Sequence, residues 1–93
     1  MLQVAANPMD AFLDYLTIEC GLSVNTIQAY QRDLGRLAAF MDIDDDGRGW
    51  DAVTGDDVLA FLMAEKQRGC AVPTVSRALV AARMFFRYLS AER

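Results

Sequence analysis

Arginine and short polar side chains are the residues of this sequence best suited to do chemistry, because histidine is absent. Without histidine, a Ser-His-Asp triad, a histidine general base and a histidine-ligated metal are all excluded. Cys20 and Cys70 lie far apart, without the C-x-x-C spacing of a metal or redox pair. Gly47-Arg48-Gly49 lacks the strand and the helix-opening glycine of a phosphate-binding loop. The sequence therefore predicts no cofactor.

The acidic run from residue 42 to residue 47 matches the opening of a calcium-binding EF-hand loop. Such a loop needs a glutamate at its twelfth position, where this chain has Val53, and the helix that follows is out of register. We therefore interpret the run as a solvent-exposed loop, with calcium binding as the weaker alternative, and expect no metal site.

Charge is distributed unevenly along the chain, which has a net charge of −4. Seven aspartates and one arginine lie between residues 42 and 57, whereas four arginines and one glutamate lie between residues 71 and 93. A negative total can hide a local positive face, so the charge does not exclude a nucleic-acid partner.

Residues that start and stop helices divide the chain into four helices, at about 8–20, 23–41, 55–68 and 73–91. Starts are indicated by Asn7-Pro8, by Ser23, by Thr54 with Asp57 as a capping box, and by Pro73, while Gly21 and Gly69 indicate ends. No segment alternates with a period of two, so no sheet is expected. The prediction is one all-α domain over residues 1–93, a four-helix orthogonal bundle.

Each predicted helix has one apolar face at the helical period, and these faces form the predicted core. They consist of Met9, Phe12, Leu13, Leu16 and Cys20; Ile27, Tyr30, Leu34, Leu37, Ala38 and Met41; Val58, Leu59, Phe61 and Leu62; and Val75, Ala78, Leu79, Ala82, Phe85, Phe86 and Leu89. Val80, Ala81 and Met84 are predicted to point outward.

Polar and basic side chains occupy the outward faces of the second and fourth helices. Free N–H groups and a partial positive charge make helix starts suitable for phosphate, and arginine can reach phosphates or guanine edges. Arg83, at the edge of the core face, is expected to be a structural ion-pair partner. Alternatively, Ser23 is only a helix cap and the arginines only solvate their face. The candidate DNA-contacting residues from this argument are Ser23, Asn25, Thr26, Arg32, Arg36, Thr74, Ser76 and Arg77.

Four runs of the chain, in order and over residues 9–93, resemble the N-terminal segment of XerC/XerD-type tyrosine recombinases of the phage-integrase family. They are residues 12–16 (FLDYL) with 21–26 (GLSVNT), 30–34 (YQRDL), 50–58 (Trp50, then VTGDDV), and 74–89 (TVSRAL, then AR, F and YL). The resemblance implies a SAM-like core-binding domain that forms half of a C-shaped clamp around a DNA recombination half-site. In that family the second and fourth helices face the major groove.

The resemblance also implies roles for individual residues. It implies that Asn25 and Thr26 meet phosphate, that Arg32 lies two turns further along the same face, and that Thr74 and Arg77 approach DNA. Gln28 and Ser76 are weaker candidates, and Ala29 is expected to offer its methyl group to a thymine.

The family's catalytic residues have no counterpart here. Two arginines, a lysine, histidines and a tyrosine nucleophile belong to a C-terminal domain that is expected to follow residues 90–93, and Tyr15, Tyr30 and Tyr88 fit helical packing patterns instead. We therefore expect this chain to be no enzyme by itself, and its full-length parent to be a tyrosine recombinase. The sequence leaves open whether that parent resolves chromosome dimers or integrates a mobile element.

The expected partners are double-stranded DNA and other recombinase protomers in a synaptic tetramer, with Met84 and the first helix available for assembly. No membrane-spanning run or secretion signal is present, so a cytoplasmic location is expected. The acidic middle of the chain and Met84 favour an alternative of another class, a SAM-like module that binds protein. A complete small enzyme is a further alternative, which the missing motifs disfavour.

Overall fold

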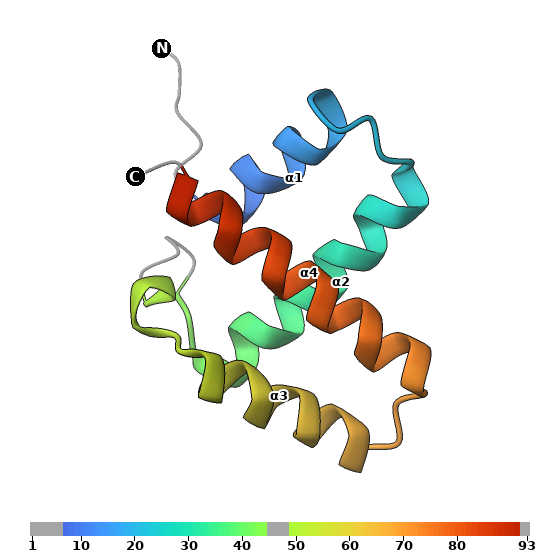
Figure 1. The fold of residues 1–93 in the computed structure, drawn as a ribbon, viewed down its shortest axis with the longest axis vertical. Coiled ribbons are helices and arrows are strands. Elements are labelled where there is room, and N and C mark those ends of the chain that lie inside the picture. The colour runs from blue at the N-terminus through green and yellow to red at the C-terminus, as the bar shows by residue number, and fades with distance from the viewer. Residues whose placement is uncertain (1–6, 45–48, 92–93) are drawn as a thin grey trace.

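Four α-helices and one short 3₁₀ helix make up the fold in the computed structural model, which describes residues 7–44 and 49–91 (Figure 1). The elements are α1 (Pro8–Ile18), α2 (Val24–Met41), η1 (Trp50–Ala52), α3 (Gly55–Gln67) and α4 (Val72–Ala91). The described residues contain no strand, so the all-α prediction is confirmed. The helix bounds agree with the predicted ranges to within two residues.

Side-chain caps start the first three helices as the sequence predicts. Asn7 accepts a hydrogen bond of 2.8 Å from the N–H of Met9, and Ser23 accepts one of 3.2 Å from the N–H of Thr26. Thr54 and Asp57 form a reciprocal capping box, with bonds of 2.9 and 3.2 Å. Each cap satisfies backbone N–H groups that the helix itself leaves without a partner.

Gly21 and Gly69 have φ angles of +65° and +100°, a backbone conformation that favours glycine. Both follow helix ends, as predicted. The turn at Gly69 lets the N–H of Cys70 bond to the carbonyl of Glu65 at 3.1 Å. It thereby folds the α3–α4 connection back towards the end of α3, where the candidate site lies.

The helices cross rather than run side by side. α4 passes across α2, with α1 above and α3 below in the view of Figure 1, and α4 contacts all three other helices. Ala78, Ala81 and Ala82 on α4 are all buried, and their small side chains allow this close approach. The prediction that Ala81 points outward was wrong, because a helix packed on three neighbours buries more than one face.

Aromatic rings join the elements in the core. Phe12 of α1 and Phe85 of α4 are completely buried with ring centroids 5.3 Å apart, and Trp50 meets Phe85 edge-on at 4.8 Å. Tyr88 lies 5.4 Å from Phe12 and 5.1 Å from Tyr15, which confirms Tyr15 as a packing residue. The η1 segment therefore closes the core through its tryptophan.

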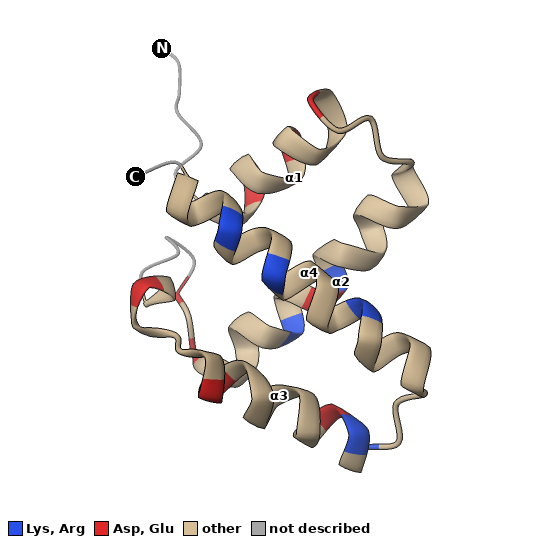
Figure 2. Ribbon diagram, viewed as in Figure 1, with Lys and Arg blue, Asp and Glu red and all other residues tan. Residues whose placement is uncertain are grey.

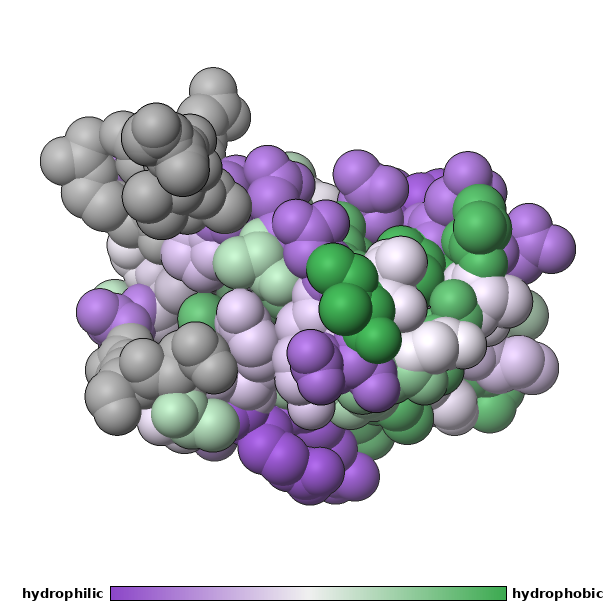
Figure 3. All heavy atoms as spheres, turned by 90° about the horizontal axis from the view of Figure 1, so that it is seen from above, coloured by the Kyte–Doolittle hydropathy of each residue, from purple (hydrophilic) through white to green (hydrophobic). Residues whose placement is uncertain are grey.

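Most residues of the predicted core faces are buried or packed against the core, with two exceptions. Leu59 is 55% exposed and Cys20 is also exposed, because α3 and the end of α1 bury narrower faces than the pattern predicts. Exposed apolar atoms lie in separate groups among hydrophilic ones on the face in Figure 3. None of the helices in the described ranges has the length and apolar character needed to cross a bilayer.

Candidate nucleic-acid interface

A hollow of about 150 Å³ lies where the middle of α2, the end of α3 and the first turns of α4 meet. We call the charged residues that line it the arginine notch: Arg32, Asp33 and Arg36 from α2, Glu65 and Arg68 from α3 and its cap, and Arg77 from α4. Figure 2 shows basic and acidic positions on α2 and α4 where the two helices cross, and others at the end of α3.

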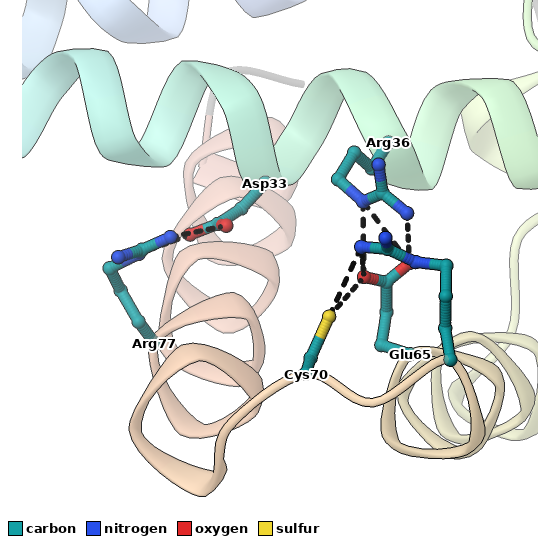
Figure 4. Close-up of polar contacts among 6 residues, drawn as sticks. Asp33, Arg36, Glu65, Cys70 and Arg77 are labelled. Carbon is teal, nitrogen blue, oxygen red and sulfur yellow. Dashed lines mark hydrogen bonds and ion pairs between the residues drawn. The ribbon is translucent and has the colours of Figure 1, made fainter.

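Glu65 is the centre of one half of the notch (Figure 4). Although only 8% exposed, it accepts hydrogen bonds from Arg36, the shortest being 2.8 Å from Nη2, and one of 3.0 Å from Nη2 of Arg68. The hydrogen bonds from Arg36 outweigh the cost of burial and lower the pKa of Glu65 to about 2. Glu65 is therefore ionised at neutral pH and orients two guanidinium groups.

Cys70 completes this cluster from the α3–α4 connection. Its thiol donates to Oε2 of Glu65 at 3.2 Å, and its sulfur accepts from Nη2 of Arg68 at 3.1 Å. The hydrogen bond to Glu65, together with burial, raises the pKa of the Cys70 thiol. Because the thiolate is the reactive form, the geometry favours a packing role over a nucleophilic one.

Asp33 and Arg77 form the other half of the notch and tie α2 to α4 (Figure 4). Nε and Nη2 of Arg77 donate to the two carboxylate oxygens of Asp33 at 2.7 and 2.9 Å. The Asp33 side chain is 5% exposed and that of Arg77 is 36% exposed. The hydrogen bond to Asp33 raises the pKa of Arg77, which stays charged.

The notch has an excess of positive charge. Four arginines and two carboxylates leave a formal charge of +2 (4 − 2), in a chain whose total is −4. Arg32 is exposed and has no ion-pair partner among the described residues, and the side chains of Arg36 and Arg68 are 46% and 54% exposed. Guanidinium donors therefore remain accessible to an anion outside the protein.

The predicted contact residues fall into two groups. One group lines the hollow and consists of Arg32, Arg36, Thr74 and Arg77. Ser23, Asn25 and Thr26 lie at the start of α2, roughly 9–14 Å along the helix axis from Arg32 at 1.5 Å per residue.

Side chains near the two helix starts differ in what they can offer a ligand. The Ser23 hydroxyl donates to that of Thr26 at 3.0 Å, so part of their bonding capacity is used within the cap. Asn25, Gln28 and Ser76 are exposed. The structure therefore does not gather all the candidates into one site.

Ala29 requires a correction. It was expected on the outward face of α2 with its methyl group available to thymine, but it is only 8% exposed and belongs to the interior. The cause is the packing of α2 against α1, α3 and α4, which buries positions beyond the single apolar face of the pattern. Its neighbours Gln28 and Arg32 remain exposed.

Sequence reasoning missed three residues of the notch: Asp33, Glu65 and Arg68. A signal for the two acids was present, because Asp33 lies three residues after Tyr30 and four before Leu37, and Glu65 lies four after Phe61. Both acids therefore fall on inward-facing sides of their helices, where a carboxylate needs a cationic partner.

Arg83 also differs from expectation. It has no ion pair or hydrogen bond within the described part of the chain, whereas Arg36 and Arg77, expected to contact DNA or only to solvate their helix face, form ion pairs. Arg83 and Arg87 instead line a separate open groove of about 750 Å³ between the η1–α3 segment and the second half of α4. These two arginines therefore lie outside the notch.

The described residues hold no group of three acidic, cysteine or histidine side chains that could bind a metal ion. The acidic run considered for calcium falls partly on residues 45–48, which lie outside the described residues.

Comparison with known proteins identifies the family. Residues 9–93 match the model of the phage integrase, N-terminal SAM-like domain. The chain belongs to this family.

Relatives of this integrase domain include two proteins named tyrosine recombinase XerC and one named XerD. The chain is 39% identical over 84 residues to XerC of Herpetosiphon aurantiacus, 42% over 85 residues to XerC of Roseiflexus castenholzii, and 35% over 81 residues to XerD of Listeria monocytogenes. The alignments cover 90, 88 and 87% of this chain but only 27, 26 and 27% of the relatives. The domain thus spans about a quarter of their length. No solved structure matches it significantly.

Proposed function

We propose that this domain binds double-stranded DNA at a recombination half-site, with α2 and α4 facing the major groove, as part of a site-specific tyrosine recombinase. The observation that carries the proposal is the arginine notch, an excess of two positive charges on the surface where α2 and α4 cross. Membership of the integrase family and the recombinase names of the relatives support it.

The chemistry of the notch suits a duplex backbone. Phosphate contacts supply a large share of the affinity of DNA-binding proteins, and arginine is well suited to phosphate because its donors form a planar fork. Exposed Arg32 and half-exposed Arg68 are the side chains best placed to meet phosphates. Asn25, Gln28 and Ser76 add exposed polar groups near the starts of α2 and α4.

The test is fluorescence anisotropy with a labelled duplex that carries a XerC/XerD-type half-site, measured over a series of salt concentrations. Arg32→Ala and Arg68→Ala should each weaken binding and reduce the slope of log K against log salt by about 0.9. Arg87→Ala is the matched control, because it removes the same charge from α4 outside the notch. Each variant should first show an unchanged circular dichroism spectrum.

Two results would count against the proposal. Equal losses for Arg87→Ala and Arg32→Ala would mean that total charge, not the notch, governs binding. Binding that is absent at low salt would favour the alternative function, a module that binds protein.

The remaining parts of the proposal concern the whole protein. The parent would cut and rejoin DNA with catalytic residues outside this domain, and the domain would also contact other protomers in a synaptic tetramer. A cytoplasmic location accompanies a role in recombination of bacterial DNA.

A further inference from the structure

Arg77 differs from the other arginines of the notch in how it is held. Its Nε and Nη2 atoms bond to both oxygens of one nearly buried carboxylate, at 2.7 and 2.9 Å, so the plane of the guanidinium group follows that of Asp33. Asp33 lies in the middle of α2, on its buried side and next to buried Leu34. An arginine side chain normally loses much rotational freedom when it binds, and here most of that loss has occurred before any ligand arrives.

The donors that remain on Arg77 have a defined geometry. The pair with Asp33 uses the Nε–Nη2 edge, which leaves the end of the fork, Nη1 and the second hydrogen of Nη2, without a hydrogen-bond partner among the described residues. Two parallel N–H donors match the two acceptors, O6 and N7, that guanine presents in the major groove. No other base presents two neighbouring acceptors on its major-groove edge.

We propose that Arg77 reads a guanine in the major groove and that Asp33 is the positioning residue that aims it. This inference rests on the proposed DNA-binding function and adds the base that the site selects. Arg32, exposed and without an ion-pair partner in the part of the chain that the structure describes, supplies charge rather than selectivity.

The charge balance of the pair supports this division. The negative charge of Asp33 offsets that of Arg77, so the pair adds little to the long-range attraction that drives contact with phosphate. Its contribution is instead the fixed direction of two donors. Thr74, one turn before Arg77 on α4, lines the same hollow.

The test is selection from a library of random-sequence duplexes, with sequencing of the bound fraction. The wild-type chain should enrich a motif that contains one invariant guanine. Arg77→Lys keeps the charge but loses the planar fork, and Asp33→Asn keeps the shape but frees the arginine. Both should lower the preference for that guanine by on the order of tenfold or more, with the rest of the motif unchanged. Arg87→Lys, the matched control outside the notch, should keep the preference.

Replacing the selected guanine by 7-deazaguanine removes the N7 acceptor and locates the contact. This replacement should weaken binding of the wild-type chain, and should weaken binding of Arg77→Lys less, because lysine lacks the fixed pair of donors. If Asp33→Asn fails to fold, as judged by Trp50 fluorescence, Arg77→Lys alone decides. An unchanged motif in the folded variants, or a wild-type motif without a guanine, overturns this inference while DNA binding stands. Absence of any bound duplex overturns the proposed function as well.

Discussion

Glu65→Gln is the substitution that tests the notch most directly, because it keeps the volume of the side chain and removes its charge. Glu65 accepts hydrogen bonds from Arg36, Arg68 and Cys70, and thereby links α2, α3 and the α3–α4 connection. The difference between its pKa of about 2 and the ordinary 4.5 corresponds to at most about 3 kcal/mol. Because both arginines are half-exposed and screened by water, we expect the free energy of unfolding at neutral pH to fall by about 1–3 kcal/mol.

The dependence on pH follows from the direction of this shift. The unfolded chain takes up a proton at Glu65 near pH 4.5, whereas the folded chain does so near pH 2. The contribution of Glu65 is therefore fully present above pH 4.5 and is lost as the pH falls towards 2. The stability difference between the wild-type chain and Glu65→Gln should narrow across this window, by up to about 1.4 kcal/mol per pH unit.

Urea unfolding at several pH values provides the measurement, with fluorescence of Trp50 as the signal. Trp50 is the single tryptophan of the chain and is 4% exposed, so unfolding transfers it from the core to water. Glu19→Gln, the same chemical change at an exposed position, is the control and should alter stability by less than about 0.5 kcal/mol. Equal free energies of unfolding for the wild-type chain and Glu65→Gln at neutral pH would refute the argument. A difference between the two that stayed constant down to about pH 3 would also refute it.

Three further predictions follow from the core and the loops. Phe85→Ala removes a completely buried ring and should cost about 3–5 kcal/mol in urea unfolding, and a loss below about 1 kcal/mol would contradict its central place. Gly69→Ala should cost about 1–3 kcal/mol from backbone strain alone, since its φ is +100° and nothing lies within 4 Å of an added Cβ, and an unchanged melting temperature would count against this turn. Exposed Cys20 should react with iodoacetamide faster than Cys70, because the pKa of the Cys70 thiol is raised. Peptide mass spectrometry measures the two rates, and the reverse order would exclude the Glu65–thiol contact.

The helices and their ends could be predicted because they depend on neighbours in the chain. The caps at Asn7, Ser23 and Thr54 involve partners two or three residues away, and the apolar period is written directly in the sequence. The resemblance to the integrase family depended on the same local runs, and the family match confirmed it.

Burial beyond the main apolar face could not be predicted in the same way. Ala29 and Ala81 lie outside the arcs defined by the large apolar residues of α2 and α4, yet both are buried. A helical wheel describes one helix against one core, whereas these helices each contact three others. Small residues then decide where two helices approach most closely, and their positions depend on the crossing geometry.

The partners of the charged residues were decided by tertiary structure alone. Arg36 and Glu65 are 29 positions apart, and Asp33 and Arg77 are 44 apart. The sequence by itself established that arginines accompany the outward sides of two helices. The spacing of Asp33 and Glu65 from the apolar residues also places them on inward sides, but the prediction did not use this signal. Which acid meets which arginine depends on where α2, α3 and α4 cross, because an ion pair forms only between groups that folding brings within a few ångströms and removes from water.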